Sequence, residues 1–114
     1  MKKYFFVCYA NINRSRAAEM VSKNLAEDRG LNIESTSGAY CMLGQFNNNK
    51  LKDFLESFDE IFVMERYMEE RFVEAGVPKL KIHCLNIPDN YDIRRDDEAH
   101  DLVSLLRLRL DDYF

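Results

Sequence analysis

Histidine and cysteine, which build many metal sites and disulfide frameworks, are scarce in this sequence of 114 residues. The two histidines, His83 and His100, have no metal-ligand spacing to a partner, so we expect neither a metal site nor a cofactor. The three cysteines form an odd set without regular spacing. Such a set does not suit a disulfide framework and favours a reducing cytoplasm as the location of the protein.

Long runs of one kind of residue are also missing. No stretch approaches the ~20 apolar residues that a membrane span requires. No run of Lys or Arg exceeds two residues and the net charge is −4, which argues against nonspecific binding to nucleic acid or to an acidic membrane. No repeat, linker or low-complexity segment interrupts the chain, so its length predicts a single domain over residues 1–114.

Strand and helix patterns alternate along the whole chain. We expect strands at residues 4–8, 31–37, 60–64 and 80–85, helices at 15–29, 51–58, 66–75 and 96–113, and a loop at 38–49. The alternation predicts an α/β fold in which helices cover both faces of a four-stranded parallel sheet. The first and third strands are continuously apolar, as central strands are, whereas the second and fourth contain polar residues. The sheet order is therefore predicted to be 2-1-3-4.

The segment FFVCYANINRSRAAE, residues 5–19, joins the first predicted strand to the first helix. Cys8 ends the strand, five loop residues follow, and Arg14 and Ser15 open the helix. Loop N–H groups, the positive end of the helix dipole and a guanidinium can converge there on one phosphate. The Cys8 thiolate is then the nucleophile, and the planar fork of Arg14 pairs with two phosphate oxygens. Ser15 caps the helix or donates a hydrogen bond to the sulfur.

The predicted phosphate-binding residues form one continuous run. They are Tyr9, Ala10, Asn11, Ile12, Asn13, Arg14 and Ser15. We expect Asn11 to brace the loop through side-chain hydrogen bonds rather than to touch phosphate. A cysteine at the end of a strand is often only a core residue, but the strand before this loop and the helix after it favour the phosphate site.

The sequence VCYANINRS, followed by Ala18 and Glu19, resembles the signature V-C-x-G-N-I-C-R-S-x-x-A-E of the low-molecular-weight protein tyrosine phosphatase family, particularly its short prokaryotic and phage-type members. The similarity continues at residues 62–65 and 87–91. The resemblance implies the same sheet order and a metal-independent hydrolysis of phosphotyrosine in proteins through a phosphocysteine intermediate. It also implies that inorganic phosphate, sulfate or vanadate occupies the loop.

The chain departs from the family pattern at three positions. Asn13 stands where the family has a second cysteine, Ala10 where it has glycine, and Asn90 where it has proline. The first change removes a partner that in relatives can form a protective disulfide with the nucleophile. The chain is also shorter than the family pattern, which fits a segment between Gly44 and Leu51 in place of a longer substrate-flanking insertion, and this leaves the identity of the substrate open.

Asp89 follows Pro88 in the predicted loop after the fourth strand and matches the general-acid position of the family. The resemblance implies that its protonated carboxyl group protonates the departing tyrosyl oxygen and then activates the water that hydrolyses the cysteinyl phosphate. Asp92 is the alternative acid if the loop is shifted. The sequence Pro-Asp-Asn would also suit a simple turn.

Three aromatic residues are candidates for the substrate-flanking walls. Tyr91 either stacks on an aryl substrate or packs on its loop, and Tyr40 and Phe46 are candidates for the opposite wall. Tyr9, inside the loop, is a further residue that can face the substrate. Cys84 is expected in the core because it shares a strand face with Leu80 and Ile82.

Other functions remain open at this stage. The pattern C-x-x-N-x-N-R-S also resembles the phosphoserine phosphatase that acts on the carboxy-terminal repeat of RNA polymerase, which leaves serine specificity open. Arsenate reduction would need Cys41 and Cys84 to relay a disulfide away from Cys8. A sugar-transport phosphocarrier would not need Arg14, which promotes hydrolysis. A non-catalytic phosphopeptide-binding module is favoured only if Asp89 is misplaced.

Overall fold

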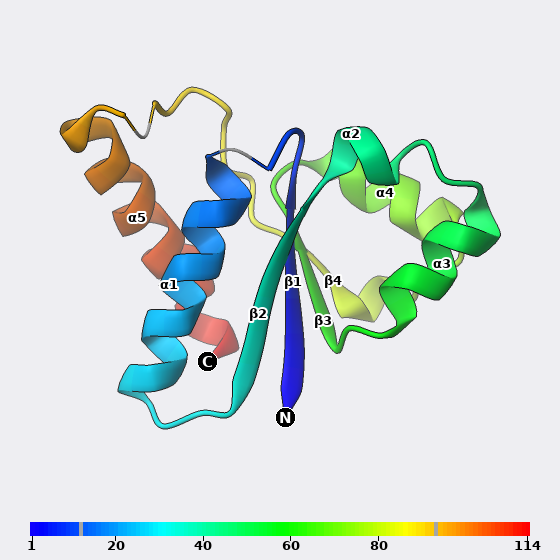
Figure 1. The fold of residues 1–114 in the computed structure, drawn as a ribbon, viewed down its shortest axis with the longest axis horizontal. Helices are drawn as coiled ribbons and strands as arrows, with labels where there is room; N and C mark the ends of the chain where they lie inside the picture. Colours follow the sequence, from blue (N-terminus) through cyan, green and yellow to red (C-terminus); the bar gives the residue numbers. More distant parts are fainter. Residues whose placement is uncertain (12, 93) are drawn as a thin grey trace.

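The computed structural model describes residues 1–11, 13–92 and 94–114. Its strands form one parallel sheet in the order β2-β1-β3-β4, which confirms the predicted order (Figure 1). The strands are β1 at Lys2–Cys8, β2 at Ile33–Ala39, β3 at Glu60–Val63 and β4 at Ile82–Cys84. Because β1 and β3 are the two central strands, the order of the sheet reverses between them.

Helices cover both faces of this sheet, as predicted. They are α1 at Arg14–Asp28, α2 at Tyr40–Leu43, α3 at Asn48–Glu56, α4 at Arg66–Glu74 and α5 at Asp96–Leu110, with 3₁₀ turns η1 at Lys79–Lys81 and η2 at Asp111–Tyr113. Figure 1 shows α1 and α5 on one side of the sheet and α2, α3 and α4 on the other. In the described ranges, no helix has both the length and the apolar character needed to cross a membrane.

β1 separates two hydrophobic cores because its side chains alternate between the faces of the sheet. Tyr4, Phe6 and Cys8 belong to the core under α1 and α5. Phe5 and Val7 belong to the core under α3 and α4. All five side chains are buried, and full burial of one phenylalanine contributes about 1.5–3 kcal/mol. The continuous apolar run of this strand thus follows from its place in the middle of the sheet.

Local signals explain where several helices begin and end. α1 and α4 are each followed closely by a glycine with positive φ, Gly30 at +65° and Gly76 at +101°. α3 begins at Asn48 because the side chain of Asn47 accepts a hydrogen bond from the backbone N–H of Lys50 at 2.8 Å.

Two segments differ from the prediction. Residues 38–49, predicted to be a loop, contain the end of β2, the helix α2 and the start of α3. Strand β4 is shorter than predicted because the backbone N–H of Lys81 donates to the carbonyl of Pro78 and closes the η1 turn. The prediction that Leu80 shares a core face was wrong, since Leu80 is 92% exposed. Cys84 is half-buried and packs against the edge of the core under α3 and α4.

Candidate active site

The loops that follow β1 and β4 meet at the carboxyl edge of the sheet and enclose a small cavity. Its volume is about 220 Å³. The described residues that line it are Cys8, Tyr9, Ala10, Asn13, Arg14 and Asp89. Ligands of open parallel sheets bind at this edge, beside the place where the strand order reverses. The topology therefore brings together the three residues that the sequence singled out for catalysis.

Cys8 lies at the end of β1 with its side chain buried against the start of α1. Its Sγ lies 3.0 Å from Oγ of Ser15, and that hydroxyl donates to Oδ1 of Asn11 at 2.6 Å. Since Ser15 has one proton, this arrangement fits a Cys8 thiol that donates to Ser15. For a thiolate, Ser15 must donate to the sulfur, and Asn11 must turn its amide NH₂ toward Ser15.

Asn11 supports this arrangement through its backbone as well. Its φ is +55°, in the left-handed region that asparagine enters more readily than most residues. That conformation turns the chain within the loop, and the Asn11 side chain holds Ser15. Asn11 thus braces the loop, as the sequence predicts, through the contact that also orients the hydroxyl beside Cys8.

Arg14 opens α1 and is only 2% exposed. Its Nη1 donates to the carbonyl oxygen of Ile87 at 2.8 Å and lies 3.2 Å from Oε1 of Glu65. Its Nε lies 3.7 Å from Oδ1 of Asp89. A guanidinium held by groups that follow two different strands has a fixed plane, which suits the recognition of two phosphate oxygens.

Glu65 is a site residue that the sequence analysis missed, although it lies in the stretch 62–65 that carries part of the resemblance. It follows β3 at the same sheet edge as Cys8 and pairs with Arg14. Burial and a hydrogen bond to Glu65 raise the pKa of Tyr67 to about 12, so its hydroxyl stays protonated at neutral pH. Glu65 thus contacts both Tyr67 and Arg14. Its contact with Arg14 depends on the pairing of β1 with β3, which the sequence of the loop alone does not reveal.

Asp89 lies on the open side of the cavity, with its side chain 63% exposed. Asp92, the alternative acid, does not line this cavity. Hydrogen bonds from the side chain and backbone of Arg94 lower the pKa of Asp92, which keeps that carboxylate ionised. A group that stays ionised is a poor proton donor, so the geometry favours Asp89 for that role.

Comparison with known proteins agrees with this architecture. The sequence model of the family described as low molecular weight phosphotyrosine protein phosphatase matches residues 3–41. A low molecular weight protein tyrosine phosphatase from Bacillus subtilis superposes with a TM-score of 0.66 at 20% identity, over 96% of this chain and 97% of that one. A low molecular weight phosphotyrosine phosphatase from Vibrio cholerae superposes with a TM-score of 0.69 at 20% identity, over 99% of this chain and 96% of that one.

A third structure, Wzb of Vibrio vulnificus in complex with benzylphosphonate, superposes with a TM-score of 0.67 at 19% identity, over 98% of this chain and 96% of that one. The chain has the fold of the low molecular weight protein tyrosine phosphatases. The family model covers β1 from residue 3 onward, the loop after Cys8, α1 and β2, and it confirms the resemblance in the sequence over this part of the chain. No protein with a curated description matches the sequence.

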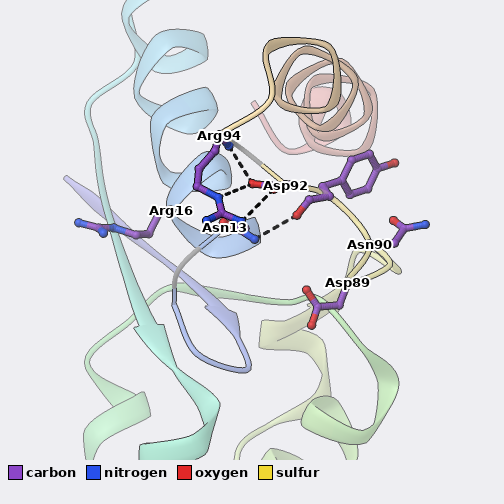
Figure 2. A pocket seen from close by; sticks show the side chains of 7 residues that line it. Asn13, Arg16, Asp89, Asn90, Asp92 and Arg94 are labelled. Atoms are coloured by element: carbon purple, nitrogen blue, oxygen red, sulfur yellow. Dashed lines mark hydrogen bonds and ion pairs between the residues drawn. The ribbon is translucent and has the colours of Figure 1, made fainter.

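Asn13 has a contact that the sequence analysis did not foresee. Its Nδ2 donates to the carbonyl oxygen of Tyr91 at 3.0 Å, as Figure 2 shows. It occupies the N-cap position of α1, yet its side chain makes no capping hydrogen bond. At the position where the phosphatase family has a cysteine, this chain therefore has an amide that joins the loop after Cys8 to the loop of Asp89.

The predicted substrate-flanking aromatic residues lie elsewhere. Tyr40 packs edge-on against Tyr67, with ring centroids 5.2 Å apart, and Phe46 packs against the core under α3 and α4. Tyr91 is half-buried against the core under α1 and α5 and lines a neighbouring groove. None of the three lines the cavity over Cys8, whereas Tyr9 does and is 53% exposed. The predicted residue Ile12 lies outside the described part of the chain.

The other two cysteines lie outside the lining of the cavity. Cys84 ends β4, which β3 separates from β1, and its Sγ donates to Oδ1 of Asn86 at 3.3 Å. Cys41 lies in α2, just beyond the end of β2, and its backbone N–H donates to the carbonyl of Tyr9 at 2.9 Å. The position of Cys84 across the sheet does not favour the disulfide relay that arsenate reduction would require.

Proposed function

We propose that this chain is a protein tyrosine phosphatase that hydrolyses phosphomonoesters through a phosphocysteine intermediate. The observation that carries the proposal is the single cavity in which Cys8 and Arg14 meet, with Asp89 on its open side. The matching family model and the shared fold support it. The three residues carry out the reaction in two successive steps.

In the first step the Cys8 thiolate attacks phosphorus. The bond between Sγ and phosphorus forms while the bond between phosphorus and the tyrosyl oxygen breaks. The protonated carboxyl group of Asp89 gives its proton to the departing oxygen, which leaves as neutral tyrosine. Arg14 pairs with the phosphoryl oxygens throughout, because a fixed guanidinium can follow them into the trigonal bipyramidal transition state.

In the second step a water molecule attacks the phosphorus of phosphocysteine. The Asp89 carboxylate takes a proton from this water, the bond between sulfur and phosphorus breaks, and inorganic phosphate leaves. Cys8 is regenerated as a thiolate, to which Ser15 can donate a hydrogen bond over the observed 3.0 Å. Asp89 ends the cycle protonated, as it began.

Phosphotyrosine in proteins is the proposed substrate class. Tyr9 offers an exposed aromatic surface at the cavity, against which an aryl ring can pack. The benzylphosphonate bound by the similar Vibrio vulnificus protein has the same combination of an aryl group and a tetrahedral anion. We also propose a cytoplasmic location, since Cys8, Cys41 and Cys84 are free thiols and the nucleophile must remain reduced.

Hydrolysis of para-nitrophenyl phosphate tests the proposal. The wild type is expected to turn this substrate over and to be inhibited by vanadate, whereas Cys8→Ser abolishes turnover. Cys84→Ser is the matched control, because Cys84 lies outside the cavity, and it should retain activity. A folded wild type that binds phosphate but shows no turnover would refute the enzymatic function and favour a phosphopeptide-binding module.

A further inference from the structure

A polar groove of about 650 Å³ adjoins the active-site cavity (Figure 2). Its lining residues are Asn13, Arg16, Asp89, Asn90, Tyr91, Asp92 and Arg94. Asn13 and Asp89 line both the groove and the cavity, so the two spaces are neighbours along the surface. The proposed reaction uses only the cavity, and this leaves the larger groove without a role.

Arg94 is held in a defined orientation beside this groove. Its Nε lies 3.0 Å from Oδ1 of Asp92 and its Nη2 lies 3.1 Å from Oδ2, while its backbone N–H donates to Oδ1 at 3.0 Å. The side chain is 88% exposed. Among the described residues, Nη1 has no hydrogen-bond partner. A guanidinium fixed on one edge in this way offers its other edge to a ligand without further ordering.

Arg16 supplies a second cation. It lies in the first turn of α1, is exposed, and forms no ion pair with any residue of the described ranges. The two carboxylates of the groove are already engaged, Asp92 by Arg94 and Asp89 by Arg14. In Figure 2, Arg94 lies beside Asn13, and Arg16 extends outward on the side of Asn13 opposite to Asp89 and Asn90.

We propose that this groove binds an acidic side chain, Asp or Glu, that lies close in sequence to the phosphorylated tyrosine. The inference rests on the proposed function and specifies its substrate class. A carboxylate in the groove accepts hydrogen bonds from the outer edge of Arg94 and pairs with Arg16. The groove thereby presents two guanidinium groups where the substrate docks, next to two carboxylates that are already paired.

Peptide binding by a Cys8→Ser variant tests this inference without relying on turnover. Fluorescence anisotropy would compare two phosphotyrosine peptides, identical except for acidic or alanine residues beside the phosphotyrosine. The acidic peptide is expected to bind more tightly by about three- to tenfold at low salt, the range of two exposed ion pairs, and the preference should shrink in high salt. Adding Arg16→Ala and Arg94→Ala should remove it, whereas Arg109→Ala, on the exposed face of α5, should not.

Charge reversal gives an outcome that misfolding cannot produce. With Arg16→Glu and Arg94→Glu, the variant is expected to favour a third peptide that has lysine beside the phosphotyrosine. An equal preference for the acidic peptide with and without the two arginines would overturn the inference, even if the wild type is an active phosphatase. Conversely, a preference that depends on the arginines would support the groove even if no phosphatase activity were found.

Discussion

The side-chain amide of Asn13 donates a hydrogen bond to the carbonyl oxygen of Tyr91 at 3.0 Å. The two residues are 78 positions apart in the sequence. Asn13 ends the loop that begins at Cys8, and Tyr91 lies two positions after Asp89. One hydrogen bond therefore connects the backbone that carries the proposed acid to the loop that carries the proposed nucleophile.

Asn13→Ala should weaken this connection and disturb the position of Asp89. A neutral hydrogen bond contributes about 1 kcal/mol, so we expect kcat on phosphotyrosine to fall about fivefold. Para-nitrophenyl phosphate has a better leaving group and needs less protonation, so its kcat should fall less. Equal losses on both substrates would show that Asn13 does not act through Asp89. Asn24→Ala, on an exposed position of α1, is the control.

Replacing each of the two aspartates separates their roles. Asp89→Asn should lower kcat on phosphotyrosine by about 10²–10⁴-fold, the usual contribution of general acid–base catalysis. Asp92→Asn should have a much smaller effect, because Asp92 is paired with Arg94 outside the cavity. Steady-state rates on a phosphotyrosine peptide would measure both, and a larger loss for Asp92→Asn would reverse the assignment.

Ser15→Ala removes the hydroxyl that lies 3.0 Å from the sulfur of Cys8. Hydrogen bonds to charged groups contribute about 1.5–3 kcal/mol, so the reaction of the thiolate with phosphate ester should slow by about tenfold or more. The measurement is kcat/KM on para-nitrophenyl phosphate. Ser104→Ala, on an exposed position of α5, controls for loss of a serine. An unchanged kcat/KM in Ser15→Ala would show that this hydroxyl does not support the nucleophile.

Tyr67 makes the stability of the fold sensitive to alkaline pH. Burial and its hydrogen bond to Glu65 raise its pKa from 10.0 to about 12. Between pH 10 and 12 the unfolded chain loses this proton first, so the stabilisation present below pH 10 is lost as the pH rises toward 12. Urea unfolding of wild type and Tyr67→Phe across this range should show a smaller decline for the variant. Parallel declines would contradict a raised pKa for Tyr67.

Much of this site follows from patterns that are local in the sequence. The continuous apolar runs of β1 and β3 predict their central places, and the strand–loop–helix order fixes Cys8 and Arg14 around one loop. The topology then brings Asp89 to the same edge, although its loop is distant in the sequence.

Contacts that depend on the direction of single side chains could not be predicted in this way. Glu65 reaches Arg14 only because β3 pairs with β1. The sequence predicts Tyr40 at the site. Because the helix α2 forms where a loop was predicted, the ring of Tyr40 instead packs against Tyr67 and Phe72. In the sequence, Asn13 stands out only because it replaces the cysteine of the family pattern. In the structure, its side-chain amide donates a hydrogen bond to the carbonyl oxygen of Tyr91.

The most direct measurement is the intact mass of the protein after rapid acid quenching during turnover of para-nitrophenyl phosphate, followed by peptide mapping. The account predicts one added phosphoryl group on the peptide that contains Cys8, and no such adduct in Cys8→Ser. A turnover-competent enzyme whose phosphoryl group lies on another residue, or that forms no phosphoenzyme under these conditions, would contradict nucleophilic catalysis by Cys8.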